Sequence, residues 1–144
     1  MLLRFEAGNV FSIAETQELS LVASKLKGNQ AGLLPIPGAS GFKAVPAALI
    51  YGANASGKTN FVRAFMFMRN AILSSHSQGN PQGGVPRVPF ALDEESETRP
   101  SHFEAEFVAS GSRYIFGFTC DSQKFLTEWL YAFPEGKRRK LYER

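Results

Sequence analysis

The segment IYGANASGKTN, residues 50–60, ends one apolar run and leads into a stretch with a different periodicity. Four of its residues are glycine or alanine, and a single lysine, Lys58, stands among them. Small side chains let a backbone turn tightly, so that its amide groups can converge on one point. The segment therefore predicts a tight turn with a cation beside it. We refer to residues 52–57 as the glycine-rich loop.

The flanks of the loop predict a strand before it and a helix after it. Residues 47–52 (AALIYG) form a short apolar run ending on glycine, which is typical of a buried strand of the parallel type. After Lys58, apolar residues recur at steps of four, three and four, and they predict a helix of about four turns packed against a sheet. The stripe consists of Phe61, Phe65, Met68 and Ile72, widened by Val62, Met66 and Leu73.

Residues 52–59 satisfy G-x-x-x-x-G-K-[ST] at every fixed position. In such a loop the backbone amides and the first amides of the helix surround a phosphate, and the lysine reaches the β- and γ-phosphates. The threonine hydroxyl binds Mg²⁺. We therefore predict that ATP and Mg²⁺ bind here, with Lys58 and Thr59 in catalytic roles and Thr59 as the metal ligand. The predicted nucleotide contacts are Gly52, Ala53, Asn54, Ala55, Ser56, Gly57, Lys58, Thr59 and Asn60.

The residues within and beside the motif indicate which class of P-loop protein the sequence resembles. With Asn54 inside the motif and Asn60 after it, GANASGKTN resembles the loop of ABC-type ATPase heads of the RecF-like, SMC-like and OLD-like kinds, the last being AAA-family ATPases of bacterial phage defence. The resemblance spans nearly the whole chain, and only the glycine-rich loop is specific. The other similar segments are GNVFSI (8–13), VPF (88–90), HFEAEFVASGSRYIFGF (102–118), EWLYAF (128–133) and KLYER (140–144).

The resemblance implies an α/β fold, a P-loop NTPase whose ABC-ATPase-like N-terminal lobe has antiparallel strands around a P-loop strand and one long helix. It implies that residues 1–144 are the N-terminal part of a head, an incomplete domain. Such heads hydrolyse ATP as dimers, so the implied partner is a second head or the remainder of the ATPase. An effector nuclease in phage defence or DNA repair is a further implied partner.

Two other functions remain open at this point. One is a different P-loop enzyme, such as a kinase, and the other is a lobe that binds nucleotide only to hold an interface. The sequence contains no N-K-x-D guanine motif, which argues against a GTPase.

The residues that hydrolysis needs in such heads are not evident. Asp93 and Glu94 follow an apolar run, as a Walker B pair would, but Pro89 interrupts that run, so we interpret them as an acidic surface turn. No segment resembles an L-S-G-G signature. We interpret His76 and His102 as solvated residues and not as a switch histidine. The chain by itself is therefore expected to lack the catalytic carboxylate.

The rest of the chain predicts an antiparallel meander. Residues 1–6 and 19–22 predict a pair of strands. Alternating aromatic residues predict a hairpin of residues 103–107 and 114–118 around ASGS, followed by a strand over 124–133 and a turn at 134–137. Trp129 and Tyr131 share one face of that strand and are interpreted as core. By the resemblance alone, Asn9, Phe11 and Ser12 would lie near the nucleotide base.

Composition excludes several classes of protein. The single cysteine, Cys120, permits no internal disulfide, and no Cys/His spacing suits a metal. The chain has neither a signal-peptide pattern nor an apolar run of membrane-spanning length, so a cytoplasmic location without membrane contact is expected. The net charge is only +3. The basic run at residues 137–140 is interpreted as protection of a sheet edge, with a nucleic-acid contact as the alternative.

We expect the 144-residue chain to bind nucleotide weakly and not to turn it over, because the glycine-rich loop is present and a catalytic carboxylate is not. A phosphate-release assay on the purified chain checks this. ATP turnover that disappears in a Lys58→Ala variant would contradict the expectation.

Overall fold

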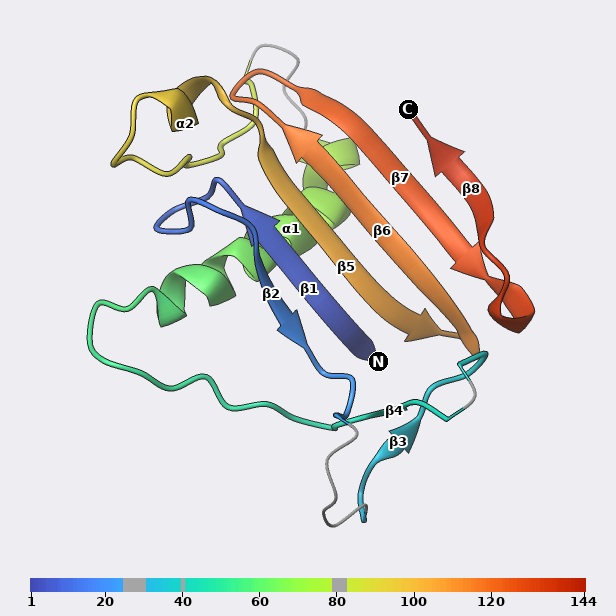
Figure 1. Cartoon of the computed structure of the whole chain (residues 1–144). Helices are drawn as coiled ribbons and strands as arrows, with labels where there is room; N and C mark the ends of the chain where they lie inside the picture. The colour runs from blue at the N-terminus through green and yellow to red at the C-terminus, as the bar shows by residue number, and fades with distance from the viewer. Residues whose placement is uncertain (25–30, 40, 79–82) are drawn as a thin grey trace.

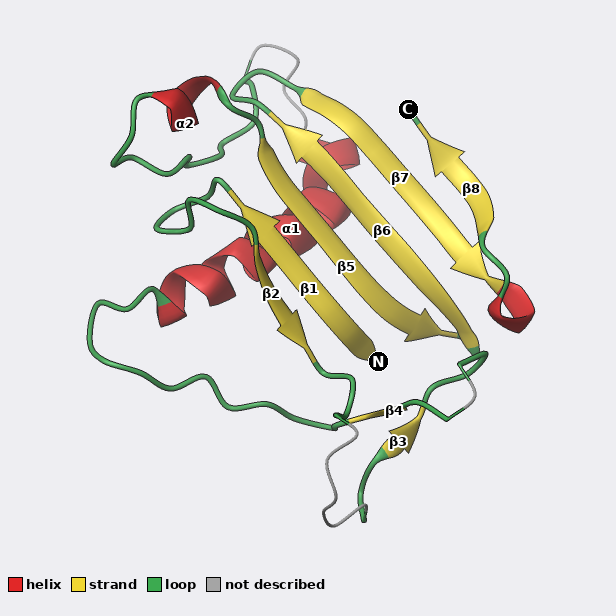
Figure 2. Ribbon diagram, viewed as in Figure 1, coloured by secondary structure: helices red, strands yellow, loops and turns green. Residues whose placement is uncertain are grey.

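A six-stranded antiparallel sheet carries one long helix, α1, on one of its faces (Figures 1 and 2). The computed structural model describes residues 1–24, 31–39, 41–78 and 83–144, and only the backbone of residues 75–78. The sheet order is β2-β1-β5-β6-β7-β8. The strands are β1 (Leu2–Gly8), β2 (Gln17–Ser20), β5 (Ser101–Ala109), β6 (Ser112–Cys120), β7 (Phe125–Phe133) and β8 (Arg139–Glu143). The remaining elements are α1 (Lys58–Gln78), a short α2 (Glu95–Thr98), a 3₁₀ turn at Pro134–Gly136, and a separate pair, β3 (Leu34–Pro35) with β4 (Lys43–Ala44).

The β1–β2 pair and the meander from β5 onward are those that the sequence predicts, whereas the pairings of β1 with β5 and of β3 with β4 were not predicted. In the β5–β6 hairpin, Phe103 lies opposite Phe118 and Phe107 lies opposite Tyr114. β1 and β2 pair antiparallel, and β7 continues the meander. The prediction of a mixed α/β fold with antiparallel strands and one main helix is confirmed.

Aromatic packing holds α1 against the sheet. Phe5 of β1 is buried and meets Phe61 and Phe65 edge to face, with ring centroids 5.4 and 5.1 Å apart. Further along, Phe67 stacks on Phe103 at 5.0 Å. Such pairs contribute about 0.5–1.5 kcal/mol beyond their buried area. Cys120 is buried in the same core, and this burial raises the pKa of its thiol to about 12.

The outer face of α1 also carries apolar residues, among polar ones. The helix has 21 residues, which is about six turns and longer than the predicted four. Ala64 and Met68 face the sheet and are buried, whereas Val62 and Leu73 are 53% and 62% exposed. The prediction that Val62, Met66, Ile72 and Leu73 belong to the buried stripe is therefore wrong. Apolar residues on more than one side of a helix do not reveal from the sequence which face is covered.

The segment before the glycine-rich loop is not a buried strand. Residues 47–52 form no strand, and Leu49 and Tyr51 are 91% and 92% exposed. In Figure 1 this segment runs outside the sheet between β4 and α1. An extended segment becomes a strand only when a neighbour pairs with its backbone, and no described strand lies beside it. The prediction of a buried parallel strand at 47–52 is wrong for this structure.

The second face of the sheet is charged. Arg4 lies within 4 Å of the carboxylates of Glu6, Glu18, Glu104 and Glu106, and the shortest contact across to β5 is 2.7 Å to Glu104. These side chains alternate with the buried ones along β1 and β5, so the period of two separates a polar face from the core.

Trp129 lies on this charged face and not in the core under α1. Its Nε1 donates to Glu104 at 2.9 Å, and His102, which lies within β5, stacks on its ring with centroids 5.7 Å apart. A Cβ at Gly117 would stand 2.3 Å from the indole, so only glycine leaves room for the ring. Tyr131 follows on the same face, because it lies two residues along β7. The prediction that both are core residues is wrong.

A buried arginine anchors the segment before β5. Arg87 is 8% exposed and donates to the carbonyl oxygens of Glu97 and Arg99 at 2.6 and 2.9 Å. It also donates to the hydroxyls of Ser101 and Ser122 at 3.2 and 3.3 Å. These contacts tie the α2 region to the start of β5 and to the β6–β7 turn.

Among the described residues, no helix combines the length and the apolar character that crossing a bilayer requires.

We expect Arg87→Ala to lower the free energy of unfolding by about 2–4 kcal/mol, because hydrogen bonds to a charged group contribute about 1.5–3 kcal/mol each and the buried Ser101 hydroxyl would lose a partner. Urea unfolding followed by circular dichroism measures the change. Arg69→Ala is the matched control, since Arg69 is exposed on α1 and its removal should change the free energy by less than about 0.5 kcal/mol. Equal effects of the two substitutions would show that Arg87 is no anchor.

Candidate functional site

The glycine-rich loop curls back on itself before α1 begins. Its φ angles are positive at Gly52 (157°), Ala55 (64°) and Gly57 (89°), and Ser56 N donates to Ala53 O at 3.3 Å. Glycine adopts positive φ without strain, and a change of backbone hand between neighbours turns successive amides toward one side. The loop is therefore curled and not extended.

Lys58 lies in the first turn of α1, and its ammonium group folds over the loop. Nζ donates to the carbonyl oxygens of Gly52 and Ala53 at 2.9 and 2.6 Å and approaches Ser56 Oγ at 3.4 Å. All three acceptors are neutral, and no described carboxylate forms an ion pair with this lysine. An anion at the loop would meet this charge together with the positive end of α1.

One hydrogen bond ties the start of α1 to the turn after β1. Asn60 Nδ2 donates to Ser12 Oγ at 2.9 Å, and a Cβ on Gly57 would lie 3.0 Å from the same oxygen. Asn60 Oδ1 accepts from Arg63 at 3.3 Å. Asn60, which the sequence predicts as a nucleotide contact, thus uses its amide to position the β1–β2 segment beside the glycine-rich loop.

An open cleft of about 610 Å³ lies between the glycine-rich loop, the first turns of α1 and the β1–β2 segment. We name it the loop cleft. Its walls include Ser12, Glu15, Tyr51, Lys58 and Phe61. The volume falls within the range of about 300–1,000 Å³ that is usual for small-molecule sites. The loop, its lysine and a cleft of suitable size therefore meet at one place.

Comparison with protein families identifies the chain. The family model described as "AAA domain, putative AbiEii toxin, Type IV TA system" matches residues 47–144. The chain belongs to this AAA family. No curated protein matches it. AAA domains with a phosphate-binding loop bind ATP and Mg²⁺ as a class, so the family supports a P-loop ATPase-type domain with nucleotide-binding function.

The AAA match begins close to the glycine-rich loop and leaves residues 1–46 outside it. Those residues nevertheless supply β1, which lies between β2 and β5 in the sheet, and Ser12 of the loop cleft. The structural unit of this AAA domain is therefore larger than the matched segment.

Within the AAA domain, the structure places the predicted loop residues together at the start of α1. Gly52, Ala53, Asn54, Ala55 and Ser56 are exposed, and Thr59 is exposed in the first turn of the helix. Of the predicted contacts, Ser56, Gly57 and Lys58 line the loop cleft, whereas Gly52, Ala53, Asn54, Ala55, Thr59 and Asn60 are not part of its lining. Thr59 is the hydroxyl residue that directly follows the lysine, as the motif requires of a magnesium ligand.

Of the three residues expected near the base, only Ser12 lines the loop cleft. Asn9 is buried, and its amide donates to the carbonyl oxygens of Ser96 and Arg99 at 2.8 and 2.5 Å. Its Oδ1 accepts from Phe90 N at 3.1 Å. Phe11 packs against the core. Asn9 therefore fixes the α2 region to the sheet, and the expectation that it contacts a nucleotide is wrong.

Asp93 precedes the short helix α2 and bonds to its first turn. Its carboxylate accepts from Ser96 N at 2.9 Å and from Ser96 Oγ at 2.7 Å, and these hydrogen bonds lower its pKa. Asp93 and Glu94 border a different hollow, formed with residues 88–92, and neither lines the loop cleft. This agrees with their interpretation as an acidic surface turn. The side chain of His76 lies outside the described residues.

The structure adds residues that the sequence did not single out. Glu15 and Glu18 bring two carboxylates to the loop cleft, and each forms a 3.4 Å ion pair, with Arg99 and Arg4 respectively. Tyr51 and Phe61 add aromatic walls. The sequence contains little indication that these residues line one cleft, because they come from three separate segments that only the fold brings together. Among the described residues, no group of three His, Cys, Asp or Glu side chains is placed to bind a metal.

We expect Gly57→Ala to lower the free energy of unfolding by more than the roughly 1–2 kcal/mol that a left-handed backbone costs other residues. The added methyl would also press on Ser12 Oγ at 3.0 Å. Gly32→Ala is the control, because Gly32 has φ +85° but nothing within 4 Å of its Cβ position. Chemical unfolding compares the two variants. If they were equally destabilised, the contact between the loop and the β1–β2 segment would not contribute.

Proposed function

We propose that the loop cleft binds ATP with Mg²⁺, and that this domain serves an ABC-type ATPase of the RecF-like or OLD-like kind. The observation that carries the proposal is the position of Lys58 Nζ, held over a curled loop by neutral acceptors at 2.6–2.9 Å. A phosphate can replace these carbonyl contacts with a charged partner, and charge-assisted hydrogen bonds are about twice as strong as neutral ones.

The residues present fit the proposed ligand. The exposed backbone of residues 52–57 would hold the phosphates, Lys58 would neutralise the β- and γ-phosphates, and the Thr59 hydroxyl would bind Mg²⁺. Tyr51 and Phe61 line the same cleft of about 610 Å³, and we propose that the base and the ribose lie beside them. Bound ATP would supply the phosphoanhydride bond whose cleavage drives such ATPases.

Exposed apolar surface supports the proposal that residues 1–144 form one lobe of a head. Leu49 and Tyr51 before the loop, and Val62 and Leu73 on the outer face of α1, are more than half exposed. Exposed apolar residues that gather in a patch mark an interaction surface, and we propose that these side chains belong to one. We infer that the remainder of the ATPase covers it and brings the carboxylate that activates water. Dimerisation of two heads around ATP, and control of an effector nuclease in defence, would follow from the resemblance to those ATPases.

A lobe that binds nucleotide without hydrolysing it is the second candidate. It is favoured by the pairing of Glu15 and Glu18, the carboxylates of the loop cleft, with arginines. Nucleotide-dependent dimerisation of the chain without turnover would favour this candidate.

The basic run at residues 137–140 does not support a nucleic-acid site. Arg138 lies over the ring of Tyr131 at 3.7 Å, and Lys140 forms an ion pair with Glu143 at 3.5 Å. β8 is an edge strand that is exposed along its whole length. Charged side chains there keep the edge from pairing with another sheet.

We expect Lys58→Ala to weaken Mg²⁺-dependent ATP binding by about 10- to 100-fold, because one charge-assisted contact of about 1.5–3 kcal/mol is lost. Isothermal titration calorimetry of the 144-residue chain with ATP and with GTP measures this, and ATP should bind more tightly. Lys137→Ala is the matched control, since Lys137 is exposed and lies outside the loop cleft. Unchanged affinity in Lys58→Ala would refute the proposed site.

A further inference from the structure

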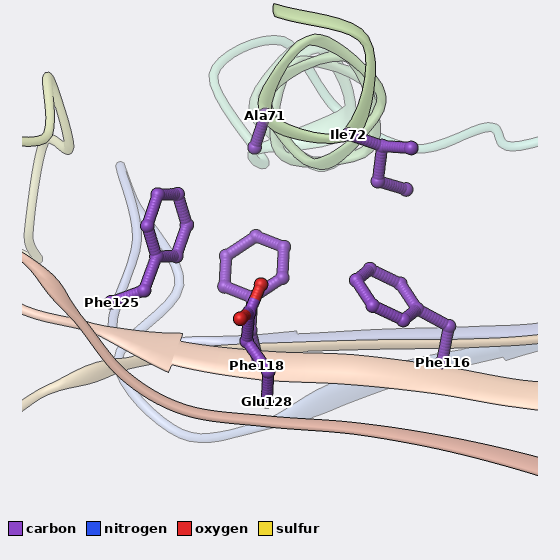
Figure 3. A pocket seen from close by; sticks show the side chains of 6 residues that line it. All are labelled: Ala71, Ile72, Phe116, Phe118, Phe125 and Glu128. Atoms are coloured by element: carbon purple, nitrogen blue, oxygen red, sulfur yellow. The ribbon is translucent and has the colours of Figure 1, made fainter. Parts of the chain in front are cut away.

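A second cavity of about 210 Å³ lies between the last turns of α1 and strands β6 and β7 (Figure 3). Its lining shares no residue with the loop cleft. In Figure 3, Ala71 and Ile72 of α1 stand above the cavity, the rings of Phe116, Phe118 and Phe125 stand around it, and the carboxylate of Glu128 points into it from β7. We name it the aromatic cavity.

The position of Glu128 follows from strand alternation. It lies directly opposite Phe118 in the β6–β7 pair, so it shares the face of the sheet that packs against α1. The other residues that line the aromatic cavity are all apolar. A carboxylate in apolar surroundings is costly unless it is paired and hydrogen-bonded. The side chain of Glu128 is nevertheless only 18% exposed, so it needs compensating partners.

Only one of the two oxygens of the Glu128 carboxylate has hydrogen-bonding partners in the described structure. The Tyr142 hydroxyl donates to Glu128 Oε2 at 2.9 Å, and the Arg144 guanidinium reaches the same oxygen at 2.5 Å. Among the described residues, Oε1 accepts no hydrogen bond. Because the Arg144 side chain is 64% exposed, solvent screens its charge. The aromatic cavity therefore retains one acceptor atom and residual negative potential.

We propose that the aromatic cavity binds a primary alkylammonium ion. Its ammonium group donates to Glu128 Oε1, and its aliphatic chain lies among the phenylalanine rings and Ile72. Aromatic rings attract cations as well as alkyl groups, so the lining suits both ends of the ligand. A volume of about 210 Å³ equals the share of about seven waters in the liquid, which is room for a small amine.

The alternatives fit the same lining less well. An anionic ligand would be repelled by Glu128. A purely apolar ligand would exclude water from Oε1 without supplying a donor, and leaving a buried acceptor unpaired costs free energy. The charge of the ligand is therefore the property that distinguishes the proposal from simple hydrophobic filling.

Calorimetric titration of the 144-residue chain with n-butylammonium chloride tests the proposal, with 1-butanol as the neutral ligand of equal shape. We expect n-butylammonium to bind at least tenfold more tightly than 1-butanol. Glu128→Gln should weaken the binding of n-butylammonium at least tenfold. Glu143→Gln is the matched control and should retain it, because Glu143 pairs with Tyr131 and Lys140 outside the aromatic cavity.

A second variant separates ligand binding from the attachment of β8, since Glu128→Gln also changes the contacts of Tyr142 and Arg144. Ala71→Leu fills the aromatic cavity from α1 and leaves the carboxylate in place, so it should abolish binding. Equal affinities for the amine and the alcohol would overturn the proposal, as would unchanged binding in Ala71→Leu. Absence of binding at about 10 mM ligand would overturn it too, since even a site with a Kd of about 1 mM would then be saturated.

Discussion

The edge-to-face contact of Phe5 with Phe61 and Phe65 is the interaction on which the candidate site depends. It seats the first turns of α1 over β1, and Phe61 also forms a wall of the loop cleft. The start of the helix is thereby held beside the turn that follows β1, where Asn60 reaches Ser12. The ammonium group of Lys58 and the glycine-rich loop are placed by hydrophobic packing, and the polar contacts then adjust their positions.

Two kinds of information in the sequence proved reliable. Alternation of aromatic residues around ASGS predicted the β5–β6 hairpin, because the pairing is local and the turn sets the register. The motif at 52–59 predicted a curled loop followed directly by a helix, since its glycines lie where positive φ angles are needed. In both cases all the residues that determine the structure lie within a short segment.

The incorrect predictions share one cause. Each depended on which distant part of the chain packs against a segment, and the segment's own sequence does not contain that information. The run at 47–52 was interpreted as a buried strand, and the structure leaves Leu49 and Tyr51 exposed because no described strand pairs with them. Periodicity placed Trp129 and Tyr131 on one face, but it could not say that α1 covers the other. Asn9 looked like a ligand contact, and its partners turned out to be backbone groups some ninety residues away.

The central position of β1 has a consequence for how the chain folds. Phe5 of β1 pairs with Ala105 of β5, so β1 is synthesised well before the strand with which it pairs. Contacts between such distant residues slow folding, and until they form the backbone edge of β1 that pairs with β5 stays open to other chains. The nascent polypeptide would therefore be most prone to aggregation after α1 has emerged and before β5 has.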